Sequence, residues 1–156
     1  MALREPFRFQ TRIRFIDTDA SGRIHYTAMF RYFESAEIEF LRALGVTYDA
    51  QRGYNLPRVH VECDFMRVIG HDDLITIEVS LTKLGRSSIR LEFRTFKADD
   101  LAAKGAVVMA STDRKTLASV PIPDNLRAKL SPVLESAEGA DGADQTEPPE
   151  LSGLGG

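Results

Sequence analysis

Two acidic residues of the form Asp-x-Asp, Asp17 and Asp19, stand directly before a stretch with helical periodicity. A carboxylate is ionised at neutral pH, so it can attack a carbonyl carbon or hold a water molecule that does so. The free backbone N–H groups at a helix start can stabilise the oxygen that becomes negative in such a reaction. This order of residues therefore favours chemistry on a carbonyl group.

The flanking segments show the periodicities of the elements that must position the acidic loop. Apolar residues alternate with polar ones over about residues 7–15, which predicts a strand. Between about Thr27 and Leu44 they recur at spacings of three and four, which predicts one long helix that stops at Gly45. Four later strands are predicted near residues 59–65, 75–81, 89–93 and 106–112. Short connections between these strands favour antiparallel neighbours, and so an α+β fold whose five-stranded sheet curls around the helix.

Length and charge indicate one domain followed by a tail. We assign residues 1–131 to the domain and expect residues 132–156, rich in Ala, Gly, Pro and acids, to be disordered. Six of the 23 acidic residues lie in that tail, whereas all 20 Lys and Arg residues precede it, so the body is mildly basic. Such a body suits a phosphate-bearing small molecule, and it lacks the clustered basic face typical of nucleic-acid binders.

The cysteine content and the distribution of apolar residues indicate the compartment in which the protein works. A single cysteine, Cys63, excludes an internal disulfide, and the first residues lack the apolar core of a signal peptide, so we expect a cytoplasmic protein. No stretch approaches the roughly 18 apolar residues of a membrane span, so no membrane partner is expected. Cys63 shares an apolar strand face with Val61 and Phe65, which predicts a core position.

The acidic loop and the helix after it carry a resemblance to a known family. The run Arg14-Phe-Ile-Asp-Thr-Asp-Ala20, then Gly22, His25, Tyr26 and Phe30 to Glu34, resembles the hotdog-fold acyl-CoA thioesterases of the 4-hydroxybenzoyl-CoA thioesterase family. The similarity extends from about Thr11 to Arg114. It implies the hotdog fold, a curved five-stranded antiparallel sheet wrapped around one long central helix. It also implies hydrolysis of coenzyme A thioesters at sites formed between two subunits.

The resemblance assigns roles to particular positions. The family's catalytic carboxylate falls on Asp19, and its carbonyl-polarising backbone N–H falls on Tyr26. His25 is a further candidate, as a proton shuttle or a substrate contact. The substrate's CoA phosphates would meet a basic, hydroxyl-bearing turn made by Lys83, Arg86, Ser87 and Ser88. Acyl-CoA is then the partner, no metal or separate cofactor is needed, and the chain would form a homodimer or homotetramer.

Other interpretations stay open at this point. Asp17 and Asp19 can simply cap a turn, and the helix acids Glu34 and Glu37 can form either a solvated face or a carboxylate site of a second hotdog type. A hydratase or dehydratase acting on acyl thioesters would need an acid and base pair, for which Asp19 and His25 are the candidates. A non-catalytic acyl-CoA binding module is the third alternative.

Overall fold

The computed structural model describes residues 5–47 and 52–135 of the chain. Its principal elements are β1 (Phe7–Arg12), α1 (Ala28–Ala43), β3 (Arg58–Phe65), β4 (Leu74–Leu84), β5 (Ser88–Lys97), β6 (Asp100–Ala110) and α2 (Asp124–Leu130). Shorter elements are the 3₁₀ turns η1 (Phe15–Asp17) and η2 (Ser131–Val133) and the two-residue strands β2 (Tyr54–Asn55) and β7 (Thr112–Asp113).

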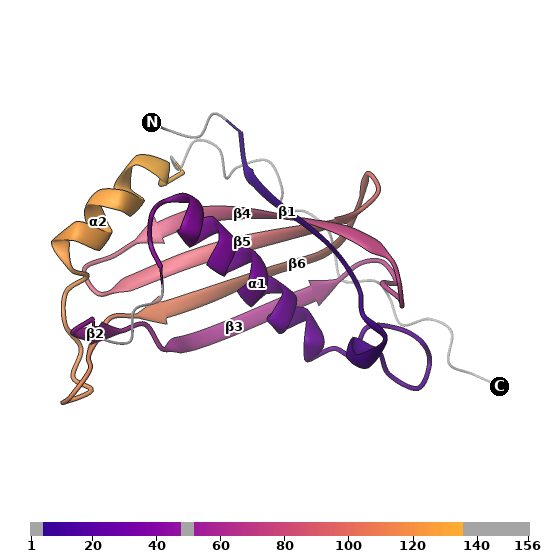
Figure 1. Cartoon of the computed structure of the whole chain (residues 1–156), viewed down its shortest axis with the longest axis horizontal. Helices are drawn as coiled ribbons and strands as arrows, with labels where there is room; N and C mark the ends of the chain where they lie inside the picture. Colours follow the sequence, from indigo (N-terminus) through magenta and orange to yellow (C-terminus); the bar gives the residue numbers. More distant parts are fainter. Residues whose placement is uncertain (1–4, 48–51, 136–156) are drawn as a thin grey trace.

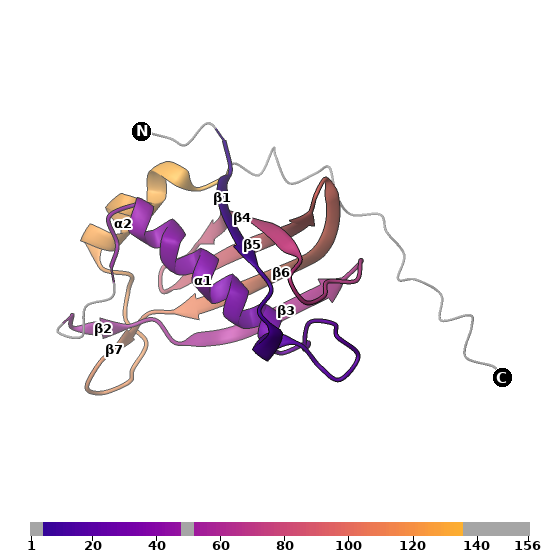
Figure 2. The same cartoon turned by 45° about the vertical axis from the view of Figure 1, so that its right-hand side comes forward.

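Five of the strands form one antiparallel sheet in the order β1-β4-β5-β6-β3. This confirms the predicted α+β class and the five-stranded antiparallel sheet. Helix α1 crosses one face of the sheet, while α2 lies beside one end of it (Figures 1 and 2). The small pair β2 and β7 lies at the same end as α2 (Figure 2).

Helix α1 packs on the sheet through the apolar residues of its predicted stripe. Phe33 is fully buried and stacks on Phe93 of β5, with ring centroids 4.6 Å apart. The helix approaches β6 closely because residue 105 is a glycine: a Cβ there would lie 2.4 Å from the Phe33 ring. The helix ends where expected, since Gly45 adopts a φ of +75°.

The structure differs from the predicted strand pattern in two places. β1 ends at Arg12, and the chain then tightens into η1, so Phe15 is 76% exposed and does not continue the buried face. β3 and β4 are joined by a short segment but are not neighbours, because β4 pairs with β1 and β5 whereas β3 pairs with β6. The segment between them instead packs against the acidic loop, where Ile24 donates a hydrogen bond to the Ile69 carbonyl.

β3 is an edge strand with exposed side chains on both faces. Val59 is 61% exposed, Val61 48% and Phe65 43%, so these three side chains of the predicted apolar face are not covered within the single chain, whereas Cys63 packs against the core. Cys63 is only partly buried, although burial raises the pKa of its thiol to about 12. An exposed apolar edge of this kind is a surface that another strand can cover.

The described chain continues past the last helix. Residues 132–135 include the end of η2, and Leu134 bridges Leu81 in parallel while Glu135 donates a hydrogen bond to the Leu81 carbonyl at 2.9 Å. Residues 136–156, which hold most of the predicted tail, lie outside the described residues. Within the described ranges, no helix is both long and apolar enough to cross a membrane.

Candidate active site

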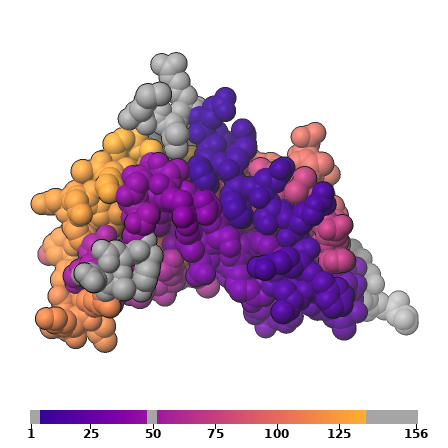
Figure 3. Space-filling model, in the orientation of Figure 1, coloured from indigo at the N-terminus to yellow at the C-terminus, as the bar shows by residue number. Residues whose placement is uncertain are grey.

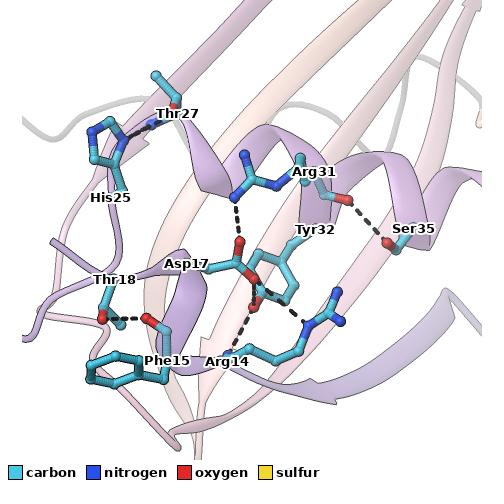
Figure 4. Close-up of polar contacts among 9 residues, drawn as sticks. All are labelled: Arg14, Phe15, Asp17, Thr18, His25, Thr27, Arg31, Tyr32 and Ser35. Atoms are coloured by element: carbon cyan, nitrogen blue, oxygen red, sulfur yellow. Dashed lines mark hydrogen bonds and ion pairs between the residues drawn. The ribbon is translucent and has the colours of Figure 1, made fainter.

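The first acid of the motif, Asp17, is the buried anchor of the loop. Its carboxylate accepts a hydrogen bond from the Tyr32 hydroxyl at 2.6 Å and pairs with Arg31, both on α1, and it lies 3.8 Å from the Arg14 side chain (Figure 4). The Tyr32 hydroxyl in turn accepts from the Arg14 backbone N–H at 3.0 Å. These hydrogen bonds, from Tyr32 first and then Arg31, lower the pKa of Asp17 despite its burial. Asp17 thus fixes η1 to the first turns of α1.

The loop after Asp17 folds back on itself before the helix begins. His25 donates its backbone N–H to the Asp17 carbonyl at 2.8 Å, Thr18 and Ile24 form an antiparallel bridge, and Asp19 donates to the Arg23 carbonyl. Gly22 completes the turn with a φ of +79°. Asp19 and the helix start are therefore carried on the two arms of one tight loop.

The second acid, Asp19, is placed quite differently from Asp17. It is exposed, and its Oδ1 accepts hydrogen bonds from the Ser21 hydroxyl at 2.6 Å and the Ser21 N–H at 2.8 Å. These bonds lower the pKa of Asp19. Asp17 is therefore buried and held by hydrogen bonds, whereas Asp19 presents an ionised carboxylate at the surface of the loop.

The helix start supplies backbone donors beside this loop. The first turn is closed by a hydrogen bond from Ala28 N–H to the His25 carbonyl at 2.8 Å. Among the described residues, none accepts a hydrogen bond from the Tyr26 N–H. This group, near the positive end of the α1 dipole, is available to a ligand. The Tyr26 side chain itself is 68% exposed.

His25 is engaged locally. Its Nδ1 lies 2.8 Å from the Thr27 hydroxyl and 3.3 Å from the Thr27 N–H (Figure 4). Its ring stacks on Tyr26 with centroids 4.9 Å apart. Because the Thr27 N–H can only donate, a neutral His25 carries its proton on Nε2. This arrangement holds the His25 ring against Thr27, the residue before α1, and leaves Nδ1 occupied.

The predicted phosphate-binding turn lies at the other end of the sheet. It joins β4 to β5 on the α2 side of the molecule, whereas the acidic loop lies beyond the opposite end of α1 (Figure 1). The ten residue steps of β4 separate the two regions by roughly 33 Å, at about 3.3 Å per residue. Lys83 and Arg86 are exposed there, and Ser87 and Ser88 are partly exposed. A single chain therefore does not bring this turn to Asp19.

Sequence reasoning missed a residue that supports the turn. Arg127 of α2 donates a hydrogen bond to the Gly85 carbonyl at 2.6 Å and another to the Arg86 carbonyl at 3.3 Å. Ile122 also donates its N–H to the Arg86 carbonyl. No local pattern reports a contact between residues about 40 positions apart. The contact of the Tyr32 hydroxyl with Asp17 is likewise not marked by any sequence pattern, and the polar end of this aromatic side chain is the one signal that could have suggested it.

A hollow of about 830 Å³ lies between the C-terminal half of α1 and the start of β3, and we call it the α1–β3 hollow. Its wall combines aliphatic side chains with five charged ones, Glu34, Glu37, Arg42, Arg52 and Arg58. Glu37 is only 1% exposed and forms an ion pair with Arg58. Burial raises the pKa of Glu37 although Arg58 opposes that shift. No group of three or more His, Cys, Asp or Glu side chains suited to a metal ion occurs within residues 5–47 and 52–135.

Comparison with known proteins identifies the family and the fold of the chain. Residues 13–130 match the model of the thioesterase-like superfamily. A 1,4-dihydroxy-2-naphthoyl-CoA hydrolase of Synechococcus elongatus is 30% identical over 125 residues, which cover 78% of this chain and 92% of that protein. Many solved structures are also similar to the chain. A hypothetical protein from Aquifex aeolicus shows 30% identity, a TM-score of 0.75 and coverage of 80% of this chain and 99% of that one.

The second solved structure is a gentisyl-coenzyme A thioesterase, with 26% identity and a TM-score of 0.72, covering 79% of this chain and 98% of that one. The hotdog fold expected from the sequence is thus shared with a solved thioesterase structure. Because the superfamily match spans most of the chain, the protein belongs to the thioesterase-like superfamily and is a thioester hydrolase.

Proposed function

We propose that the protein hydrolyses an acyl-CoA thioester to a free carboxylic acid and coenzyme A, as members of the 4-hydroxybenzoyl-CoA thioesterase family do. The observation that carries this proposal is the loop of the acidic motif, which holds the exposed carboxylate of Asp19 beside a helix start whose Tyr26 N–H has no acceptor among the described residues. The relatives named above as hydrolases of aryl-CoA thioesters supply the substrate class.

The proposed chemistry uses these two groups in turn. The Asp19 carboxylate attacks the thioester carbonyl, or it removes a proton from a water molecule that attacks. The carbonyl oxygen becomes negative and accepts a hydrogen bond from the Tyr26 N–H, a contribution of roughly 3–4 kcal/mol for one such donor in other enzymes. The carbon–sulfur bond then breaks and CoA leaves as the thiolate. In the first route, water hydrolyses the mixed anhydride formed with Asp19, which releases the acid and restores the carboxylate; in the second route, the attacking water has already supplied the oxygen of the acid. No metal or separate cofactor enters these steps.

The proposal requires a second copy of the chain. Asp19 and the turn from Lys83 to Ser88 lie at opposite ends of one sheet. The edge strand β3 exposes Val59, Val61 and Phe65, so it offers an apolar and hydrogen-bonding surface to another β3. If the two β3 strands pair antiparallel about a two-fold axis, the two sheets run in opposite directions. The end of one sheet that carries the acidic loop then lies beside the end of the partner sheet that carries the β4–β5 turn.

The test compares Asp19→Asn with Asp113→Asn. Asp113 is a matched control because it also caps its own exposed loop, accepting hydrogen bonds from Lys115 N–H at 2.9 Å and Thr116 N–H at 2.7 Å. We expect wild type and Asp113→Asn to release thiol from acyl-CoAs at similar rates, and Asp19→Asn to lose at least about 100-fold in kcat. Full turnover by Asp19→Asn would exclude the assignment, and products formed without thiol release would favour a hydratase.

A further inference from the structure

β3 runs along one margin of the molecule, between the acidic loop at one end and β2 at the other (Figure 1), and Figure 3 shows the same margin with its side chains. Just past the strand, Met66 donates its N–H to the Ala102 carbonyl at 2.8 Å, so the backbone of residue 66 points toward β6. Strand residues point alternately to their two neighbouring strands, so residues 60, 62 and 64 also point toward β6. The backbone groups of Val61, Cys63 and Phe65 therefore point to the free edge, where no described strand lies.

The side chains of β3 divide into two faces of different character. Cys63 packs against the buried core, so the odd-numbered residues from 61 onward lie on the face of α1. His60, Glu62 and Asp64 lie on the opposite face, where Glu62 Oε1 lies 2.7 Å from Arg90 Nη2 of β5 and Oε2 lies 3.4 Å from His60 Nε2. The side chains of His60 and Glu62 are 53% and 50% exposed. The free edge thus carries one imidazole and two carboxylates on a single, partly exposed face.

A two-fold axis limits how two copies of β3 can pair. Residues directly opposite each other in an antiparallel pair share one face of the sheet. An axis at right angles to the sheet therefore passes through a residue and its own copy, not between two residues. The outward backbone groups of Val61, Cys63 and Phe65 can then bond one another across the edge. Near the middle of the strand, axes at Val61, Glu62 and Cys63 meet these conditions.

The charged face of β3 disfavours two of these axes. With the axis at Glu62, the two copies of this acid lie directly opposite each other, although His60 then faces Asp64 of the partner subunit. With the axis at Cys63, each Glu62 lies opposite the partner's Asp64, so four carboxylates gather near the axis. Like charges directly opposite each other destabilise an antiparallel pair. Arg90 lies beside Glu62 of its own chain in each case, so it does not favour one axis over another.

An axis at Val61 brings unlike groups together. Each Glu62 then lies opposite the partner's His60, and each Asp64 lies opposite the partner's Arg58, at the start of the strand. An imidazole has an N–H to donate to a carboxylate whether or not it is protonated. Across this axis the acids of β3 face no other acid of β3.

We infer that two copies of the chain pair through β3 with Val61 on the two-fold axis, so that His60 of each protomer binds Glu62 of the partner subunit. This inference rests on the proposed function, which requires a second copy, and it adds the register in which the two copies join. The same register packs Val61 against the partner's Val61 and places Phe65 opposite the partner's Pro57.

The register decides which parts of the two chains meet at the site. Pro57 belongs to the wall of the α1–β3 hollow. Past Phe65, the chain runs on to the segment that binds the acidic loop through the hydrogen bond from Ile24 N–H to the Ile69 carbonyl at 2.8 Å. This segment then runs beside the partner's hollow. Moving the axis by one residue would slide the chains by two residues, roughly 6.6 Å at about 3.3 Å per residue, which is far more than a reacting group tolerates.

Disulfide formation across the axis tests the register. Val61→Cys and Glu62→Cys are each combined with Cys63→Ser, and the native thiol of Cys63 in the wild-type chain is the third position. Residues opposite each other have Cα atoms about 5.5 Å apart, and a disulfide needs less than about 7 Å. With the axis at Val61, the two Glu62 Cα atoms lie roughly 8 Å apart and the two Cys63 Cα atoms roughly 14 Å apart. We expect copper-catalysed oxidation to give a disulfide-linked dimer with Val61→Cys alone.

Sedimentation over a concentration series tests the charge pairing independently of any disulfide. His60→Glu should raise the Kd of the dimer by about 10-fold or more, because it places like charges opposite each other twice. Adding Glu62→Gln should recover most of the affinity, whereas adding the matched control Asp64→Asn should not. Recovery with Asp64→Asn and not with Glu62→Gln would place the axis at Glu62 and overturn the inference.

The oxidation experiment has two further outcomes that overturn the inference. A linked dimer with Glu62→Cys or with the native Cys63 would show another register, and the absence of any linked dimer would show that β3 does not pair with its own copy. Failure of the proposed function has a different signature. We expect the linked Val61→Cys dimer to release thiol from acyl-CoAs as fast as its reduced form, whereas a protein that links as expected but releases no thiol in any form, wild type included, would retain the register and lose the proposed function.

Discussion

Replacing Asp17 by Asn should destabilise the protein without removing a reacting group. The carboxylate is 4% exposed and accepts a hydrogen bond from Tyr32 inside the protein at 2.6 Å. An Asn side chain fills the same space but carries no charge, and its NH₂ group would face the guanidinium of Arg31, which is also a donor. The change therefore isolates the charge of Asp17.

The size of the effect follows from the burial of each partner. The buried hydrogen bond from Tyr32 to the charged carboxylate is worth about 1.5–3 kcal/mol. The side chains of Arg31 and Arg14 are 61% and 79% exposed, so solvent screens both ion pairs and each adds about 0–1 kcal/mol. Because Asn still accepts one hydrogen bond, we expect a loss of about 2 kcal/mol, which lowers the unfolding midpoint by about 6–10 °C.

Thermal and urea unfolding at several pH values provide the assay. The folded pKa of Asp17 lies below its ordinary value of 3.8, so its contribution is present above that value and is lost as the pH falls through the folded pKa. The difference between wild type and Asp17→Asn should be constant from about pH 5 to 8 and should shrink below about pH 4. Asp99→Asn, in the exposed turn before β6, is the control that should change little.

Tyr32→Phe completes a double-mutant cycle. Since it removes the hydroxyl that joins Asp17 to the Arg14 N–H, the double variant should lose less stability than the two single losses added together. Strict additivity, or an Asp17→Asn variant as stable as wild type at pH 7, would refute the anchoring role of Asp17.

Three further outcomes follow from the structure. Gly105→Ala should cost about 2–3 kcal/mol in urea unfolding, because its Cβ would meet the Phe33 ring, whereas Gly53→Ala, with open space at its Cβ, should cost little. Cys63 should react with iodoacetamide at pH 8 at least about 100-fold more slowly in the folded protein than in urea, as followed by mass spectrometry, because burial raises its thiol pKa to about 12. Burial raises the folded pKa of Glu37, so ionisation of this carboxyl group costs stability as the pH rises. Glu37→Gln should therefore unfold at the same temperature as wild type near pH 4.5 and at a higher temperature than wild type at pH 7.5. Equal unfolding temperatures of the two proteins at both pH values would contradict this.

Local patterns predicted the elements well because helix and strand periodicities are properties of neighbouring residues. The expected helix from Thr27 to Leu44 is α1, Ala28–Ala43, and the alternation at residues 75–81 and 89–93 lies within β4 and β5. The first strand was predicted too long because the alternation continues through Phe15, whereas burial of the Asp17 carboxylate under α1 turns the chain at η1.

Only the part of the candidate site that lies within the acidic motif could be predicted from the sequence. The candidates Asp19, His25 and Tyr26 lie within eight consecutive residues, so a local motif could name all three. The ion pair of Glu37 with Arg58 joins residues 21 positions apart, and only the packing of α1 on the sheet brings them together. Nor can a sequence pattern report that the β4–β5 turn lies at the far end of the sheet from Asp19, since that distance is set by the length of β4.

A mixed dimer tests most directly whether the site is shared between two chains. One subunit carries Asp19→Asn and the other Arg86→Ala, and two affinity tags isolate the hybrid for acyl-CoA hydrolysis. If Asp19 works with the partner's turn, one site retains both wild-type groups, so the hybrid should show about half the wild-type kcat with the wild-type KM. A hybrid whose KM is raised to that of the Arg86→Ala homodimer would show that each chain uses its own turn, and would contradict the shared site.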